Sequence, residues 1–425
     1  MNLKISRNTL AEFTVILILI EANYWALLSK VLISDIRFTV LGLSSLGAFV
    51  YLNRKIKKQD IYLLWILYIA VVLVNNKELA AGTHLNTLRI VLCLSIVFVG
   101  MYSEQWIKNI PQLIVLVGCF NVLFTWLFFL NNGLYEKFIG LTYKAYQPGT
   151  YYGAYGYRAG IADHYSQNGT YITIVCLALI ASLLSDVEKK KKRIIAILAV
   201  ISIGALLLTT KRAHLMFGIA AVILTYYAIN PAKVFQKTFR LMLVVVILLI
   251  VGPVITEMIP QLGDTLLKIQ NVGTDSSSLT RISMWTYAWQ TFLEHPIMGI
   301  GWFGIRYSSL ASSIVDATTG CHNIYLELLA ETGIIGFSIF VISAVSSVII
   351  TFKNIQLLNY DEEYNAYRPV LVTSFAIQIF CLIYGLTGNM IYDRTFHFYI
   401  ICVAASLSFY INVVKKGRTR DEKYV

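Results

Sequence analysis

The sequence predicts an all-α, polytopic membrane protein with about 12 transmembrane helices and a large extracytoplasmic loop that bears an amphipathic helix. The first observation behind this fold class is composition. Of the 425 residues, 57% are hydrophobic and only 14% are charged, whereas soluble domains average about 25% charged residues. The mean hydropathy is +0.67. The second observation is a series of apolar runs of spanning length, and the third is the distribution of lysine and arginine between the segments that join them.

Twelve apolar runs are long enough to cross a bilayer. The first is too long for the core of a cleaved signal peptide and lacks a cleavage motif, so it is interpreted as a transmembrane segment. The whole chain, 1–425, is therefore expected to form a single integral membrane domain. The predicted spans are 9–28, 36–52, 61–76, 88–101, 110–130, 169–185, 194–210, 213–229, 241–258, 324–352, 369–387 and 395–413.

Lysine and arginine orient these spans. With the N-terminus in the cytoplasm, 22 of the 35 Lys and Arg residues fall in cytoplasmic segments, as the positive-inside rule requires. The C-terminus returns to the cytoplasm, and the lysine run at 189–192 suits anionic lipid headgroups. Two long segments, 131–168 and 259–323, remain outside. The net charge of +12 follows from this distribution and does not indicate nucleic-acid binding.

Cysteine spacing indicates neither a disulfide framework nor a structural zinc site. Five of the six cysteines fall inside apolar runs, where they pack as small hydrophobic residues. Only Cys321 lies in a polar stretch, and no C-x-x-C pair occurs. We therefore expect no metal ion and no cofactor.

A basic pair lies on the side of the membrane that the charge bias disfavours. Lys211 and Arg212 join two spans through the shortest external turn of the chain, so Arg212 is held close to the membrane surface. Basic residues at span ends often extend their charges toward water. Anion binding is the favoured interpretation here, because the short turn leaves these side chains little room to extend toward water.

Residues 278–293 of the second long loop predict an amphipathic helix. Large apolar side chains recur along one of its faces, and a tryptophan-rich face of this kind would lie along the outer leaflet. They are Ile282, Trp285, Trp289 and Phe292. Arg281 falls in the first turn of this helix. It could contact a lipid headgroup or bind a phosphate, and the sequence leaves both interpretations open.

The first long loop combines tyrosine with glycine. Residues 141–171 hold eight tyrosines, more than an interfacial aromatic belt requires. A tyrosine ring offers carbohydrate both an apolar face and a hydroxyl group. Arg158 and Asn168 lie in the same segment, which is therefore a candidate surface for a sugar chain.

A polar cluster opens the span that begins near residue 324. The sequence GCHNIYLELLAETGIIGF at 320–337 places Glu327 and Glu331 on one helix face, and His322 or Asn323 can cap the helix. Charged groups at this depth usually have a partner or a function, and the external arginines are candidate partners. A neutral imidazole accepts a proton from a hydroxyl, and arginine pairs bidentately with phosphate. The combination indicates a hydroxyl nucleophile that attacks beside a phosphate leaving group at the outer membrane surface.

Four motifs occur in the order, and on the predicted side of the membrane, that one known family shares. They are YRAGIADHYSQNGTY, TTKRA, SLTRISMWTYAWQTFLEHPIMGIGWFGI and HNIYLELLAETGIIGF. Together they cover about residues 158–337, which include the second loop at 259–323. In combination they resemble the O-antigen ligase and polymerase superfamily. The lysine in TTKRA departs from the family's turn, in which a small hydroxyl residue often precedes the arginine, and this leaves the role of Lys211 open.

The resemblance implies an inverting, metal-independent glycosyltransferase in a bacterial inner (plasma) membrane. Its donor would be a glycan carried on undecaprenyl pyrophosphate, with membrane lipids, a chain-length regulator and a flippase as further partners. His322 would be the general base, and Arg212 and Arg281 would bind the pyrophosphate. Arg158 and Lys211 match more weakly, as contacts to substrate phosphate or glycan. Further candidates for substrate contact are Asn323, Glu327 and Glu331.

Two activities within the superfamily differ in their acceptor. A polymerase joins lipid-linked repeat units into capsule, exopolysaccharide or O-antigen, and the tyrosine-rich first loop favours this activity. A ligase instead transfers finished polymer to a terminal acceptor. From another class, a lipid-linked oligosaccharide flippase or transporter would need ionisable residues deep in the membrane and two similar halves. Glu21 is the clear candidate for such a residue, and a packing role is favoured for it. A non-enzymatic scaffold would need no histidine among convergent arginines.

The predicted topology can be tested by labelling single cysteines in a background without the native ones. Asn271→Cys, in the second loop, should react with a membrane-impermeant maleimide in intact spheroplasts. Lys190→Cys, in the basic cytoplasmic run, should react only after permeabilisation. Labelling of Asn271→Cys only after permeabilisation would place the loop in the cytoplasm and would refute a site at the outer face.

Overall fold

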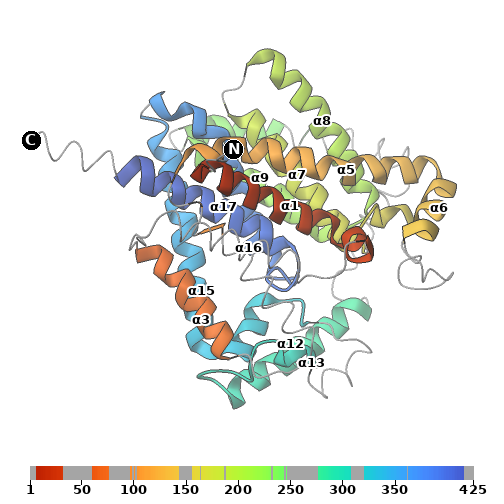
Figure 1. Ribbon diagram of the computed structural model, residues 1–425, viewed down its shortest axis with the longest axis vertical. Coiled ribbons are helices and arrows are strands. Elements are labelled where there is room, and N and C mark those ends of the chain that lie inside the picture. Colours follow the sequence, from red (N-terminus) through yellow and green to blue (C-terminus); the bar gives the residue numbers. More distant parts are fainter. Residues whose placement is uncertain are drawn as a thin grey trace, which may run out of the picture.

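The computed structural model describes residues 6–31, 60–75, 96–97, 100, 103–142, 156–162, 164–185, 188–230, 233–243, 246, 276–307, 320–360 and 362–415 (Figure 1). Every regular element in these ranges is helical. Six of their helices are long and apolar enough to cross a membrane. The chain is therefore an all-α, polytopic membrane protein, as the sequence predicts.

The helices follow the predicted spans closely. Those that correspond to predicted spans are α1 (Arg7–Val31), α3 (Asp60–Val74), α5 (Ile110–Leu130), α7 (Tyr165–Leu184), α8 (Lys189–Leu208), α9 (Arg212–Ile229), α15 (Ile324–Leu357), α16 (Arg368–Tyr384) and α17 (Thr395–Phe409). The remaining elements are η1 (Gln105–Asn109), α6 (Asn132–Thr142), η2 (Gly156–Ala159), α12 (Ser276–Glu294), α13 (Gly304–Tyr307), η4 (Glu362–Tyr367) and the π-helical turn η5 (Tyr410–Val414). The predicted spans 36–52, most of 88–101 and most of 241–258 lie outside the described residues.

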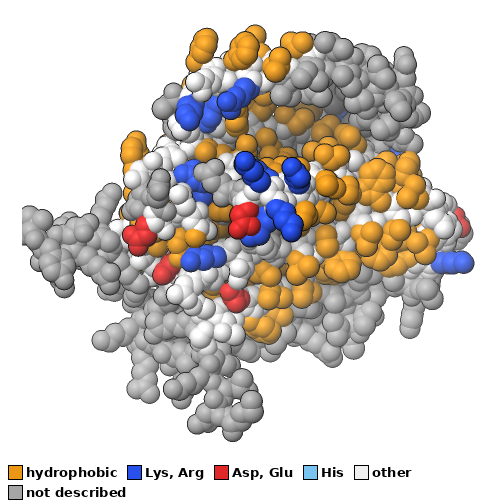
Figure 2. All heavy atoms as spheres, turned by 90° about the horizontal axis from the view of Figure 1, so that it is seen from above, with side chains coloured by type: hydrophobic (Ala, Val, Ile, Leu, Met, Phe, Trp, Pro, Cys, Tyr) orange, Lys and Arg blue, Asp and Glu red, His pale blue; other side chains and the backbone are white. Residues whose placement is uncertain are grey.

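Three helices form the centre of the bundle. Nearly every residue of α17 is buried, and α7 and α16 are buried along most of their length. In contrast, α5, α8, α9 and α15 carry rows of exposed apolar side chains, as helices in contact with lipid do. Figure 2 shows hydrophobic side chains in a broad band beside a group of lysines and arginines. The basic residues 189–193 at the start of α8 are mostly exposed.

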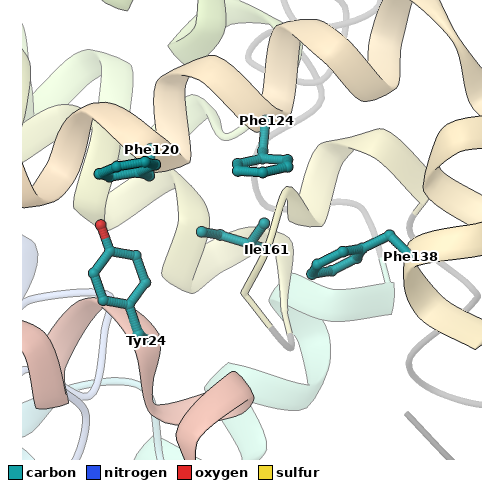
Figure 3. A pocket seen from close by; sticks show the side chains of 5 residues that line it. All are labelled: Tyr24, Phe120, Phe124, Phe138 and Ile161. Carbon is teal, nitrogen blue, oxygen red and sulfur yellow. The ribbon is translucent and has the colours of Figure 1, made fainter. Parts of the chain in front are cut away.

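The first predicted loop, 131–168, begins with a helix that the sequence analysis did not predict. α6 follows α5 after a sharp turn and packs back on it, because Phe128 on α5 lies against Tyr135 and Phe138 on α6. An apolar groove of about 260 Å³ opens beside this contact (Figure 3). It is lined by Tyr24, Phe120, Phe124, Phe138 and Ile161. The tyrosine-rich residues 143–155 lie outside the described part of the chain.

α15 is interrupted at Gly333, whose φ of 62° and ψ of −170° are not helical. A short segment after α12 enters the gap and supplies the missing hydrogen bonds. The Ile300 and Gly301 amides donate to the carbonyls of Ala330 and Glu331, each at 3.0 Å, and the Ile334 amide donates to the Pro296 carbonyl at 2.8 Å. The break was not predicted from the sequence.

Two glycines make this interlock sterically possible. A Cβ on Gly333 would lie 2.2 Å from the Ile297 carbonyl oxygen, and one on Gly299 would lie 2.4 Å from the Glu331 carbonyl carbon. Both glycines also have positive φ, which side chains disfavour. Asn75 at the end of α3 completes the joint, because its side-chain amide donates to the Glu331 carbonyl at 2.6 Å.

A buried ionic cluster joins the first and last spans. Glu21 on α1 is 1% exposed. Its carboxylate lies 3.5 Å from the Arg394 guanidinium and 2.5 Å from Nε2 of His397, at the start of α17. This supports a packing role for Glu21, as the sequence analysis favoured.

Neutralising Glu21 should destabilise the bundle, because removing one member of a buried ionic cluster leaves its partners uncompensated, at a cost of about 3–5 kcal/mol. We expect Glu21→Gln to lower the midpoint of thermal unfolding in detergent clearly. Glu12→Gln on the same helix is the matched control, since Glu12 accepts only an exposed hydrogen bond from Asn109. Equal midpoints for the two variants would contradict a stabilising role of the cluster.

Candidate functional site

His322 lies immediately before α15, at the point where the chain enters that helix. Asn323 is the N-cap residue, and its side-chain oxygen accepts hydrogen bonds from the Tyr325 and Leu326 amides at 3.1 and 3.2 Å. Asn323 thus takes the capping role for which the sequence left two candidates. His322 itself is half-buried and adopts a φ of 54°.

Three helices begin around this imidazole. His164 caps α7, accepting at Nδ1 from the Ser166 amide at 3.1 Å. Lys211 is the N-cap residue of α9, and His322 precedes the cap of α15. The three side chains act electrostatically on one another, so the positive ends of three helix dipoles point into one region. Such an arrangement suits an anion.

Burial, together with the cationic surroundings, lowers the pKa of both histidines. Burial is the main cause that lowers the pKa of His322 from 6.5 to about 4. The charges that lower it further are, in decreasing order, those of Arg281, Arg306 and Lys211. Burial followed by the charge of Lys211 lowers the pKa of His164 to about 3. At neutral pH, His322 is therefore an unprotonated imidazole among fixed positive charges.

Backbone strain is concentrated in the same region. Among the described residues, the non-glycine positions with positive φ are Thr210, Phe303 and His322. Thr210 precedes the basic pair, and Phe303 lies just before α13. Each such conformation costs on the order of 1–3 kcal/mol and persists only where its surroundings enforce it, which is typical of functional sites.

α12 confirms the helix predicted over 278–293, and the exposed Ile282 and Trp289 agree with the apolar stripe expected to lie along the outer leaflet. The residues that pack inward are Met284, Ala288 and Thr291, whereas Ile282 and Trp289 are exposed. Trp285 belongs to the inner side, where its indole N–H donates to the Cys321 carbonyl at 2.7 Å. Met284 and Ala288 belong to one buried cluster with Cys321 and Ala330, at the start of α15, and Ile282 and Trp289 remain outside. The contact of Trp285 brings Arg281, one turn earlier, toward His322.

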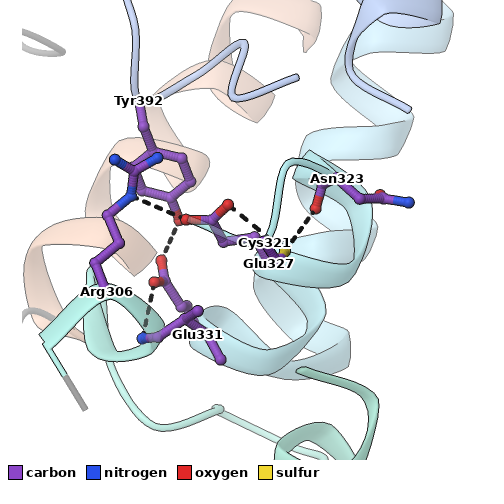
Figure 4. Close-up of polar contacts among 7 residues, drawn as sticks. Arg306, Cys321, Asn323, Glu327, Glu331 and Tyr392 are labelled. Atoms are coloured by element: carbon purple, nitrogen blue, oxygen red, sulfur yellow. Dashed lines mark hydrogen bonds and ion pairs between the residues drawn. The ribbon is translucent and has the colours of Figure 1, made fainter. Parts of the chain in front are cut away.

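A buried network includes Cys321, the residue before His322 (Figure 4). Nε of Arg306 is 3.0 Å from Oε1 of Glu327, and its guanidinium lies over the Tyr392 ring, 4.6 Å from the centroid. Glu331 accepts from the Ile305 amide at 3.1 Å and from the Tyr392 hydroxyl. Both glutamates are fully buried. The sequence analysis expected external arginines as partners for the two carboxylates; the structure places Arg306 there, which was not singled out.

The other predicted site residues lie around this centre. Arg212 is the first residue of α9 and is half-buried; of the basic pair, Lys211 is the member whose charge lowers the pKa of His322. Arg158 lies in η2, and its carbonyl accepts from the Asn168 side chain at 2.9 Å. That contact fixes η2 to the start of α7, close to His164.

Three residues of the site were not predicted from the sequence: His164, Arg306 and Tyr392. Arg306 carried a usable signal, because it is a basic residue in a segment predicted to lie outside the membrane. It therefore departs from the positive-inside rule, as Arg212 does. His164 and Tyr392 gave no such signal. In the part of the chain that the structure describes, no three His, Cys, Asp or Glu side chains are grouped to hold a metal ion.

The comparisons with known proteins concern this same region. No curated protein matches the chain. Residues 197–341 match the family model described as O-antigen ligase. The match runs from α8 into α15 and thus includes Lys211, Arg212, Arg281 and the polar cluster around His322. This match, over about a third of the chain, supports a relationship to the O-antigen ligase and polymerase superfamily, whose members are membrane glycosyltransferase-like enzymes.

Proposed function

We propose that the protein is a glycosyltransferase that polymerises undecaprenyl-pyrophosphate-linked repeat units at the outer face of a bacterial plasma membrane. The observation that carries this proposal is the neutral imidazole of His322 beside Arg281 and Lys211, where three helices begin. A base and an anion site then lie side by side, as transfer from a glycosyl pyrophosphate to a hydroxyl requires.

The proposed reaction is a single displacement at the anomeric carbon of the donor sugar. His322 removes the proton from an acceptor hydroxyl, and the oxygen forms a bond to the anomeric carbon. The bond from that carbon to the pyrophosphate oxygen breaks, and the lipid pyrophosphate leaves with the electron pair. Arg281, Arg212 and Lys211 stabilise the charge that develops on it. Attack opposite the leaving group inverts the anomeric configuration.

Polymerase remains the proposed activity over ligase because of the first loop. Its tyrosines suit a growing sugar chain, and η2, the described part next to them, lies beside the start of α7 and His164. A ligase that transfers finished polymer to a terminal acceptor is the alternative. The exposed apolar side chains of α12, such as Ile282 and Trp289, would lie in the outer leaflet and hold the site at the level of lipid headgroups.

Replacing His322 should abolish transfer without unfolding the protein. We expect His322→Ala to lower kcat by about 10²–10⁴-fold, the usual contribution of a general base. The assay incubates detergent-purified protein with lipid-linked repeat unit and EDTA, and resolves the products on a gel. A ladder supports polymerase, and transfer to an added terminal acceptor alone supports ligase. A His322→Ala variant with wild-type turnover would refute the assignment of the base.

Arginine-to-lysine exchanges test the anion site. Arg212→Lys and Arg281→Lys should each lower kcat/KM, on the order of 10²-fold, because an ammonium cannot reproduce the planar fork of a guanidinium. Arg193→Lys, at the exposed start of α8, is the matched control and should leave turnover unchanged. Near-normal turnover in both test variants would exclude a guanidinium clamp.

The pH dependence should differ between the free enzyme and the substrate complex. His322 must be unprotonated to act as a base, so kcat/KM should be lost as the pH falls through about 4, the pKa of His322. A bound pyrophosphate offsets the neighbouring cations and raises that pKa, so the acidic limb of kcat should lie at higher pH. Arg281→Gln should shift the limb of kcat/KM upward. Identical limbs for kcat and kcat/KM would contradict an anion bound beside His322.

A further inference from the structure

Arg306 and Glu327 form a largely buried ion pair beside the backbone that leads into His322; the Arg306 side chain is 15% exposed. Glu327 is 0% exposed, and its carboxylate meets Nε of Arg306 at 3.0 Å. A Cβ on Gly320 would lie 2.4 Å from Oε1 of Glu327 and 2.7 Å from the Arg306 guanidinium. The backbone two residues before His322 therefore rests directly on the ion pair.

Further contacts hold both members of the pair in place. Glu331, one turn after Glu327, accepts from the Ile305 amide, so α13 is tied to α15 beside Arg306. The Tyr392 hydroxyl donates to Glu331, and the Tyr392 ring lies between Trp302 and the Arg306 guanidinium. These contacts fix the orientation of the two side chains of the ion pair.

Cys321 connects the pair to His322. Its thiol donates to the Asn323 carbonyl at 3.1 Å and lies 3.6 Å from Oε2 of Glu327. Its carbonyl accepts from the Trp285 indole of α12 at 2.7 Å. Gly320 and Cys321 are thus contacted by the ion pair and by Trp285 of α12. His322 follows them in the left-handed conformation.

We propose that the Arg306–Glu327 ion pair is a positioning device that holds His322 in its left-handed conformation, facing the anion site. Arg306 and Glu327 are positioning residues, and neither carboxylate contacts the substrate. This revises the expectation that Glu327 and Glu331 bind substrate, and it rests on the proposed function for the role of His322. The physical reason is that a strained backbone persists only where its surroundings fix it.

The test uses Arg306→Lys and Glu327→Gln, which keep the approximate shape of each side chain. Each should lower kcat by about 10–100-fold, as small misplacements of a reacting group do, with KM for the lipid-linked donor within about twofold of wild type, since the anion site itself is intact. Glu21→Gln is the matched control. It disrupts a buried ionic cluster that joins α1 to α17, so it should reduce stability and leave kcat unchanged.

A second measurement reports the position of His322 without any turnover. Diethylpyrocarbonate modifies neutral imidazoles, and His322 is neutral at pH 7, so its modification rate, followed by peptide mass spectrometry, depends on exposure. We expect a severalfold faster rate in Arg306→Lys and Glu327→Gln, and the wild-type rate in Glu21→Gln. Wild-type kcat and wild-type modification in both test variants would overturn the proposal.

The two proposals fail in different ways. If the wild-type protein transfers no lipid-linked glycan, the proposed function is wrong, yet the modification rates still decide whether the ion pair fixes His322. Should a single exchange prevent folding, the double variant Arg306→Gln/Glu327→Gln removes both charges together and avoids an uncompensated one. A folded double variant with the wild-type kcat and the wild-type rate of His322 modification would show that the pair does not position His322.

Discussion

A helix in a membrane cannot stop and restart without exposing backbone N–H and C=O groups that lipid cannot satisfy. α15 does stop, at Gly333, and the segment after α12 supplies the lost hydrogen bonds from Ile300, Gly301 and Pro296. This exchange fixes where α12 ends and where α13 begins. It therefore determines how Arg281 on one side and Arg306 on the other approach the start of α15. Gly299 in HPIMGIG and Gly333 in ETG lie on the two segments that meet at this break.

Charge balance at the site follows from that geometry. Lys211 and Arg281 lie near His322, whereas Arg306 is held by Glu327 in the interior. The Glu327 carboxylate thus compensates the innermost of these cations. A site built in this way offers a net positive surface without an isolated charge in its core, which would be costly. Burial lowers the pKa of His322 most, and the same arrangement of cations lowers it further.

The sequence predicted the helical class and the course of nine described helices because apolar length and charge bias are local properties. It also predicted that His322 and Arg281 belong together, through motifs that share one side of the membrane. It could not predict the break at Gly333, since glycine is common within transmembrane helices. Arg306 carried a signal, as a basic residue outside the membrane, but its pairing with Glu327 could not be predicted, because the two meet only after the α12–α13 segment has folded back. The inward-facing side of α12, formed by Met284, Ala288 and Thr291, was not predicted, whereas the exposed Ile282 and Trp289 agree with the apolar stripe expected to face the outer leaflet.

The contacts of Asn75 have a further consequence for biogenesis. Its side chain bonds to backbone groups 223 and 256 residues later in the chain, and its own carbonyl accepts from Trp302. Contacts at such separation form late, since the loop between them must close first. α3 is thus synthesised before α15, the helix that carries the other half of the joint. Truncated chains that end before α15 therefore lack one half of this joint.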